Sequence, residues 1–150
     1  DATGIHYTGW QRGAYPTADT ARSIFNAGTL YVGVDETGSV WGSMNLNGQQ
    51  LPEYQNGAWT IPAEDRQVAV IHTLTIDPAR AGQGLARQMV AFAEDTARRQ
   101  DKTVLRLDTG TENLPANRMY PALGYKAAGT VDTFFMGYSQ RPLNLYEKKL

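Results

Sequence analysis

Apolar and β-branched residues fill residues 69–76 at odd and even positions alike. This pattern is typical of a central strand that is covered on both faces. The strand ends at Asp77-Pro78, because proline has no N–H to donate to a ladder. After a loop at 79–86, residues 87–99 follow a helical rhythm. We expect the apolar face of this helix to pack on the core; it contains Leu85, Met89, Phe92, Ala93 and Ala97. The charged residues Arg87, Glu94, Asp95 and Arg98 fall largely on the other faces of the helix.

The same reasoning predicts the other elements. A helix is expected over 18–26, with Thr17 as its N-cap and Gly28 as its stop. Strands are expected at 29–34 and 39–46, joined by a hairpin turn, and at 103–108, 126–130 leading into 131–138, and 142–148.

Residues 47–66 are polar and are predicted to form a long loop. In a small domain, a loop of this length more often has a function than serves only as a connection. Two aromatic residues stand within it, Tyr54 and Trp59. They either line a substrate pocket or pin the loop to the core, and the sequence leaves both open.

Glycines at 82 and 84 stand where the helix begins. Free N–H groups and the helix dipole make such a turn a site for anions, most often phosphate. The spacing excludes a P-loop, which needs a Gly-Lys-Ser/Thr run, and a dinucleotide fingerprint, which needs a small residue where Arg87 stands. The alternative is that this turn only connects the strand to the helix and binds no anion.

Residues 81–86, Ala-Gly-Gln-Gly-Leu-Ala, resemble motif A of the GNAT acyltransferases, usually written Gln/Arg-x-x-Gly-x-Gly/Ala. Gly84 and Ala86 match, whereas Ala81 does not, and Arg80 is a candidate for the missing side-chain contact. Residues 113–125 resemble the family's next segment, with Asn113, Ala116, Tyr120 and a final Leu-Gly-Tyr. The resemblance covers roughly residues 29–150.

The resemblance implies an α/β fold with a mixed central sheet, flanked by helices and splayed at a bulge between the strands at 69–76 and 103–108. It implies acetyl-CoA as cofactor, with its pyrophosphate on the glycine loop and its pantetheine amides on Leu74 to Ile76. The implied cofactor-binding residues are Leu74, Thr75, Ile76, Arg80, Ala81, Gly82, Gln83, Gly84, Leu85, Ala86, Asn113, Asn117 and Tyr120.

The absence of cysteine excludes a cysteine acyl-enzyme, so direct attack by an amine in a ternary complex is the simplest mechanism. Tyr120 is the candidate general acid, since a phenol pKa near 10 is close to a thiol pKa near 8.5. Its structural alternative is a packed helix tyrosine. His72 and Asp108 are the candidate bases, although each has a structural alternative and solvent could take the proton. Asn113 could equally cap the helix that starts near Pro115.

Length and composition set limits. The 150 residues predict one domain, and a net charge of −1 with a pI of about 6.1 disfavours nucleic acid or a membrane as main partner. The lack of cysteine excludes disulfides and thiolate metal sites, and two histidines far apart, His6 and His72, disfavour zinc. We expect a cytoplasmic protein without a metal.

The start of the chain is unusual for this family. Little in residues 1–16 can form the family's first strand, so that strand is expected to be missing or reduced, in a fragment, a processed product or a variant. The next strand would then be an exposed edge, which a second copy of the chain could cover in a homodimer.

Three functions follow. The first is an N-acetyltransferase that acts on a small-molecule or peptide amine. The second is a non-catalytic acyl-CoA-binding regulatory domain, and the third an α/β domain for another phosphate ligand such as ATP or NAD. The acidic balance and the aromatic residues favour a small or cationic acceptor, with candidate contacts at Trp10, Tyr15, Tyr54 and His72. Segments such as residues 70–72 and 106–109 also resemble small bacterial GNAT proteins that have no assigned acceptor.

Overall fold

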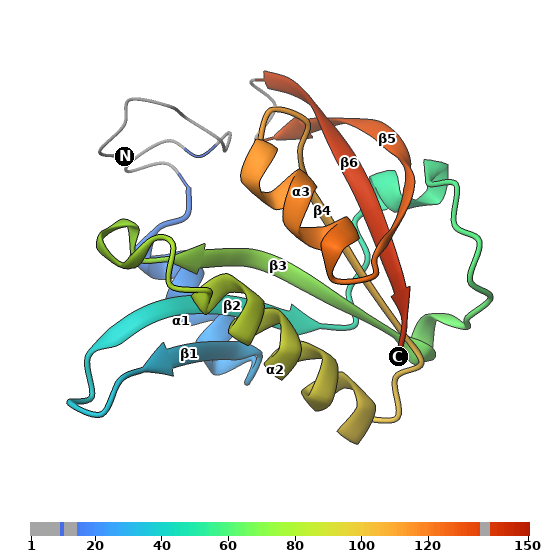
Figure 1. Ribbon diagram of the computed structural model, residues 1–150. Helices are drawn as coiled ribbons and strands as arrows, with labels where there is room; N and C mark the ends of the chain where they lie inside the picture. Colours follow the sequence, from blue (N-terminus) through green and yellow to red (C-terminus); the bar gives the residue numbers. More distant parts are fainter. Residues whose placement is uncertain (1–9, 11–14, 136–138) are drawn as a thin grey trace.

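The computed structural model describes residue 10, residues 15–135 and residues 139–150 (Figure 1). The elements of this part follow one another in the order α1 (Ala18–Asn26), β1 (Leu30–Val34), β2 (Val40–Asn47), η1 (Pro52–Asn56), η2 (Asp65–Gln67), β3 (Val68–Ile76), η3 (Pro78–Arg80), α2 (Leu85–Arg99), β4 (Val104–Gly110), α3 (Leu114–Ala122), β5 (Lys126–Phe135) and β6 (Ser139–Lys149).

The strands form one mixed sheet of six, in the order β1-β2-β3-β4-β6-β5. All neighbours are antiparallel except β3 and β4, which are parallel and connected through α2. The predicted fold class, a mixed sheet flanked by helices, is confirmed. The prediction of a missing or reduced first strand falls mainly on residues outside those described.

β3 and β4 pair over only part of their length. Their register joins residues 68–71 to residues 104–107, beyond which no pairing holds them together. β3 continues beside β2 and β4 continues beside β6, so the two halves of the sheet diverge from this point (Figure 1).

A bulge in β3 marks the point of divergence. The register against β2 shifts between Ser43 and Asn45, and Thr73 has a φ of 47°. A β-branched residue in this left-handed region is a strained conformation that only the surrounding structure can hold. The bulge turns the end of β3 away from β4, as the resemblance implies.

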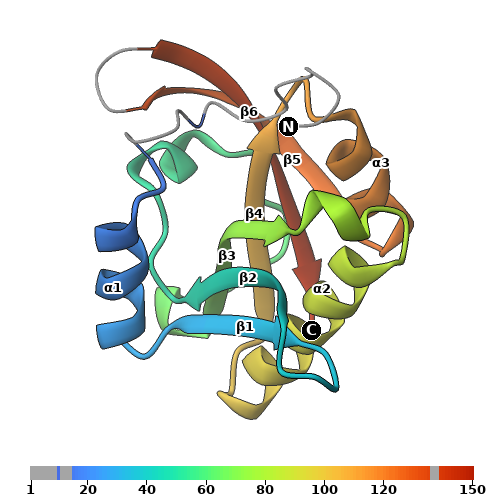
Figure 2. The ribbon, with the colours of Figure 1, turned by 90° about the vertical axis from the view of Figure 1, so that its left-hand side faces the viewer.

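Hydrophobic cores lie on both faces of the sheet, and Figure 2 shows α2 and α3 on one side of it and α1 on the other. Helices α2 and α3 lie on one face, over a cluster that includes Met44, Met89 and Leu105. On the other face the segment 48–67 packs its Tyr54 against Val70 and other residues of the strands. Both faces of β3 are therefore covered, which explains its continuous apolar run.

Several local predictions can now be compared with the structure. Thr17 is the N-cap of α1, and its side chain accepts a hydrogen bond from the Thr20 N–H. The segment 126–130 does not end at Thr130 but continues as β5 to Phe135, because its pairing with β6 resumes after a register shift. The polar segment 47–66 contains the short helical turn η1 and the start of η2.

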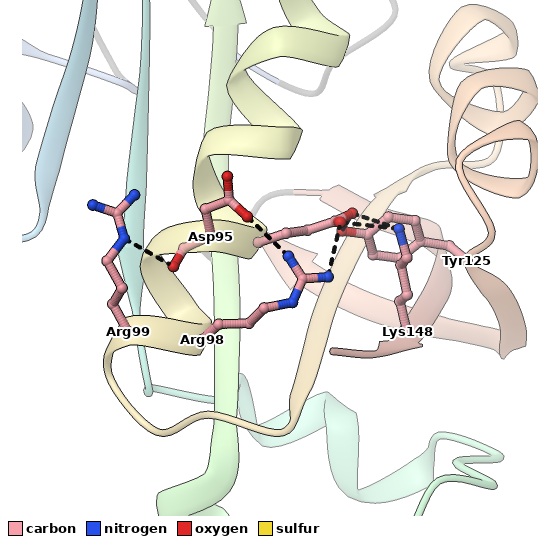
Figure 3. Close-up of polar contacts among 6 residues, drawn as sticks. Asp95, Arg98, Arg99, Tyr125 and Lys148 are labelled. Atoms are coloured by element: carbon pink, nitrogen blue, oxygen red, sulfur yellow. Dashed lines mark hydrogen bonds and ion pairs between the residues drawn. The ribbon is translucent and has the colours of Figure 1, made fainter.

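The face of α2 differs from the prediction at two positions. Glu94, predicted to lie away from the core, is only 8% exposed, while Phe92 is 44% exposed. Burial of Glu94 is possible because Lys148 of β6 and Tyr125 reach it from the other half of the sheet (Figure 3). The helical pattern alone carries no sign of these partners.

None of the helices in the described ranges is long and apolar enough to cross a membrane.

Candidate active site

A cavity of about 1020 Å³ lies where β3 and β4 diverge. The end of β3, the end of β4 with its loop, and the first turns of α3 contribute most of its wall. The wall is completed by residues from outside these elements, namely Trp10, Leu51, Pro52, Glu53, Ala86, Thr133, Arg141, Pro142 and Leu143. The divergence of β3 and β4 therefore opens a cavity whose wall is formed by residues from many parts of the chain.

A smaller hollow of about 230 Å³ lies over the glycine loop. It shares the lining residues Ile76, Ala86 and Met119 with the larger cavity, so the two hollows adjoin. Gly82 and Gly84 have φ values of 80° and 73°, and a Cβ at either would meet nothing within 4 Å. These glycines are needed for the left-handed backbone and leave open space beside it.

The backbone N–H groups from Gly82 to Arg87 donate to no other described residue, and the first of these bonds in α2 is Gln88 N–H to the Gly84 carbonyl. The helix dipole adds positive potential at the same place. Arg80 and Arg87 border the hollow, and Arg80 also bonds to Asp35 at 2.6 Å. The loop is built to receive an anion.

The edge of β3 links the loop to the interior. Leu74, Thr75 and Ile76 line the larger cavity, and on the side facing β4 their backbone groups have no strand partner. Exposed backbone donors along a cleft can hold amides and polarise a carbonyl.

Asp108 lies at the end of β4 and lines the cavity. Its Oδ2 accepts a hydrogen bond from the Tyr54 hydroxyl at 2.7 Å, and its Oδ1 accepts none from any described residue. Burial raises the pKa of Asp108, the Tyr54 hydrogen bond lowers it, and the Glu53 carboxylate raises it again, with a net rise. No basic side chain of the described residues forms an ion pair with Asp108.

Tyr120 lies on α3 and also lines the cavity, although its side chain is only 5% exposed. Its ring packs against the rings of Tyr125 and Tyr146, and its hydroxyl has no hydrogen-bond partner in the described part of the chain. Burial raises the pKa of Tyr120, and the nearby Asp108 and Tyr146 raise it further. The phenol is therefore protonated at physiological pH, a donor without an acceptor, although it is a weaker acid than an ordinary phenol.

Some predicted residues lie elsewhere. The ring of His72 is outside the cavity wall and bonds to the Asn47 side chain at 3.0 Å, and burial lowers its pKa. Asn117 bonds to backbone carbonyls of the β4–α3 loop and to β6, which leaves it no part in the wall. Trp59 donates to the Tyr54 carbonyl at 2.7 Å and pins the loop.

The other predictions fall at the cavity or close to it. Asn113 both lines the wall and caps α3 through Ala116, so its two proposed roles are compatible. Trp10 lines the wall, and the ring of Tyr15 lies 6.3 Å from it, centroid to centroid. Tyr54 donates a hydrogen bond to Asp108 but does not itself line the cavity. Of the loop residues, Ala81 and Leu85 border the smaller hollow and Gln83 does not.

Sequence reasoning missed many residues of these walls, among them three polar ones, Arg87, Glu53 and Thr133. Arg87 could have been identified, since it stands in the first turn of the helix after the glycines. Glu53 and Thr133 carry no local signal, because a polar loop and a late strand bring them together only in the folded chain.

Comparison with known proteins now adds to this geometry. The sequence model of the Acetyltransferase (GNAT) family matches residues 3–125. The chain belongs to this family. An N-acetyltransferase of Methanocaldococcus jannaschii, itself uncharacterised, is 31% identical over 68 residues, 45% of this chain. A streptothricin acetyltransferase of Escherichia coli is 31% identical over 87 residues, 58% of this chain. The matches span 30% and 45% of those two proteins.

Solved structures share the fold. A GCN5-related N-acetyltransferase of Kribbella flavida aligns over 94% of this GNAT chain and 82% of its own, with a TM-score of 0.70 and 21% identity. A structure from Salmonella typhimurium, solved with its cofactor acetyl-CoA, aligns over 98% of this chain and 79% of its own, with a TM-score of 0.68 and 18% identity. The predicted family is confirmed by its sequence model, and the solved structures confirm the fold.

Among the residues that the structure describes, no three histidine, cysteine, aspartate or glutamate side chains are grouped so that they could hold a metal ion.

Proposed function

We propose that this GNAT domain transfers the acetyl group of acetyl-CoA to a primary amine of a small molecule or peptide, by direct attack in a ternary complex. The observation that carries the proposal is that the two hollows adjoin, with the glycine loop and its free N–H groups beside the cavity where β3 leaves β4. Acetyl-CoA supplies a pyrophosphate and an acetyl thioester joined by a long amide-containing arm.

Each part of the site has a role in this proposal. The free N–H groups of the glycine loop, with Arg80 and Arg87, hold the pyrophosphate. The unpaired edge of β3 at Leu74 to Ile76 holds the amides and polarises the thioester carbonyl. Asn113 borders the same arm.

The proton movements fall to two side chains. Asp108 accepts the proton that the amine loses as nitrogen bonds to the carbonyl carbon, directly or through water. Tyr120 donates a hydrogen bond to the departing sulfur as the C–S bond breaks and keeps its proton, and the CoA thiolate takes a proton from water after it leaves. With its pKa raised, Tyr120 is more effective as a hydrogen-bond donor than as a full proton donor.

Thermal unfolding with acetyl-CoA, CoA, ATP and NADH in parallel tests the cofactor. At a hundred times its dissociation constant a ligand adds about 2.7 kcal/mol, which for a chain of this length raises Tm by about 5–10 °C. We expect this rise with acetyl-CoA and CoA alone. Gly84→Val should abolish it, because the side chain strains a left-handed position and fills the open space. A normal rise in that variant would refute the assignment of the loop.

Release of free thiol in the presence of amines then tests transfer. Tyr120→Phe should lower kcat on the order of 10–100-fold while the rise in Tm with CoA persists. Cofactor binding without thiol release from any amine would favour a non-catalytic acyl-CoA-binding domain instead.

A further inference from the structure

The wall of the larger cavity carries more negative than positive charge. Of the charged residues in the wall, Glu53, Asp108 and Glu112 are acidic and Arg141 is basic. Arg141 is exposed and forms no ion pair with any described residue, so water screens its charge. The acidic side chains also differ in how they are held. Glu53 lies on η1, and the next residue of η1, Tyr54, is hydrogen-bonded to the proposed base Asp108.

The short helix η1 sets the position of Glu53. Its neighbour Tyr54 is 3% exposed and donates to Asp108 at 2.7 Å, which ties η1 to the end of β4. Glu53 itself is half-buried, and its Oε1 accepts a hydrogen bond from the Thr133 hydroxyl at 3.1 Å. Thr133 is 8% exposed, so the carboxylate of Glu53 is held against a buried strand residue rather than left in solvent.

Two groups in this wall lack a partner. The Tyr120 hydroxyl, on a side chain 95% buried, and the Oδ1 of Asp108 have no hydrogen-bond partner among the described residues. Neither atom is sealed from solvent, because Arg106 Nε is the one fully buried side-chain nitrogen or oxygen without a partner among the described residues. Both residues line the cavity and keep unused hydrogen-bonding capacity, so a ligand in the cavity can bind to them. The like charges of Glu53 and Asp108 also oppose each other, and a cation between or beside them would relieve this.

We propose that Glu53 is a specificity determinant and that the acceptor is a compact amine with a second cationic group, such as an alkyl diamine. This rests on the proposed function. One nitrogen lies at Asp108 and Tyr120 and is acetylated, whereas the other remains an ammonium ion and binds the carboxylate of Glu53. Thr133 is a positioning residue, because it holds that carboxylate in the wall.

Three acceptors of matched length test this inference with acetyl-CoA: 1,4-diaminobutane, butylamine and 4-aminobutanoate. A charge-assisted hydrogen bond corresponds to roughly 10–100-fold, so kcat/KM for the diamine should exceed that for butylamine by this factor. We expect 4-aminobutanoate to be the poorest of the three, since its carboxylate would face Glu53. A preference for 4-aminobutanoate would overturn the inference and assign the distal subsite to Arg141.

Glu53→Gln should bring the ratio of diamine to butylamine to within about twofold of one, mainly by raising KM for the diamine, while kcat/KM for butylamine stays within about threefold. Thr133→Val should lower the ratio partway. The matched control is Glu112→Gln, which removes the same charge from a residue of the same wall outside η1 and should leave the ratio unchanged. An unchanged ratio in Glu53→Gln, or an equal fall in Glu112→Gln, would overturn the role of Glu53.

Failure of the two proposals can be told apart. If CoA binds but no amine is acetylated, calorimetry of the CoA-loaded protein with 1,4-diaminobutane decides. Binding of the diamine that Glu53→Gln weakens roughly 10-fold or more would support the inference although transfer fails. An absence of binding, or equal binding to both proteins, would overturn it.

Discussion

Two carboxylates of this domain, the buried Glu94 and the half-buried Asp108, have opposite surroundings. Glu94 of α2 and Asp108 of β4 each accept a hydrogen bond from a tyrosine hydroxyl, Glu94 from Tyr125 at 3.1 Å and Asp108 from Tyr54 at 2.7 Å. Glu94 in addition bonds to Lys148 at 2.8 Å and has the Arg98 guanidinium at 3.7 Å (Figure 3). No such cation accompanies Asp108 among the described residues.

This difference separates a structural carboxylate from one available to a ligand. The charge of Glu94 is compensated by protein groups, so it joins α2 to β6, and it lines neither of the two hollows described above. The charge of Asp108 is compensated by one phenol, and burial without a cation raises its pKa. A buried carboxylate that lacks a cation and opens on a cavity is a candidate for proton transfer or for binding a cation.

The largest expected effect is on Asp108. Asp108→Asn should lower kcat/KM on the order of 10²–10³-fold, as loss of a general base does. Its Tm at neutral pH should not fall. The raised pKa means that the native state binds this proton more tightly than the unfolded state, so wild-type stability decreases as pH rises through the interval between the two pKa values. The variant lacks that decrease. Retained activity with a lower Tm would instead make Asp108 structural, like Glu94.

Glu94→Gln should give the opposite result. We expect a loss of about 1–2 kcal/mol in the free energy of unfolding, less than for a fully buried pair because Lys148 is partly exposed. Chemical denaturation measures this, and kcat/KM should stay within about twofold. Asp95→Asn on the same helix is the control, since its exposed pair with Arg98 should contribute less than about 0.5 kcal/mol.

The two tyrosine donors give a finer comparison. The Tyr54 hydrogen bond lowers the pKa of Asp108, so Tyr54→Phe should move the acidic limb of kcat/KM to higher pH and cost activity a few-fold, more in mildly acidic than in mildly alkaline buffer. Tyr125→Phe should leave the limb in place and lower stability by about 0.5–1.5 kcal/mol. An equal shift of the limb in both variants would contradict the comparison.

The smallest effect is expected at His72, a titratable residue outside the cavity. His72→Gln should keep kcat/KM within about twofold. Because burial lowers the pKa of His72, the unfolded chain binds its proton more readily, and wild-type stability falls as pH drops below the ordinary value of 6.5. The variant should show less of this fall in a plot of Tm against pH. A large loss of activity would return His72 to the candidates for the base.

The sequence by itself determined the elements whose signals are local. The apolar run of β3, the glycine loop and the helix α2 were predicted, α2 with two errors on its buried face, at Phe92 and Glu94. These features depend on the pattern of neighbouring residues along the chain. The family followed from the two loops, and with it the splay of the sheet. Asn113 as a cap was likewise readable.

Only the tertiary structure decided which polar residues meet. Glu94 looked exposed by periodicity and is buried, because Lys148 lies 54 residues later in the chain. The same separation joins Tyr54 to Asp108, and 80 residues separate Glu53 from Thr133. Electrostatic compensation depends on distance in space and on burial, and neither is recorded in the spacing of residues along a chain.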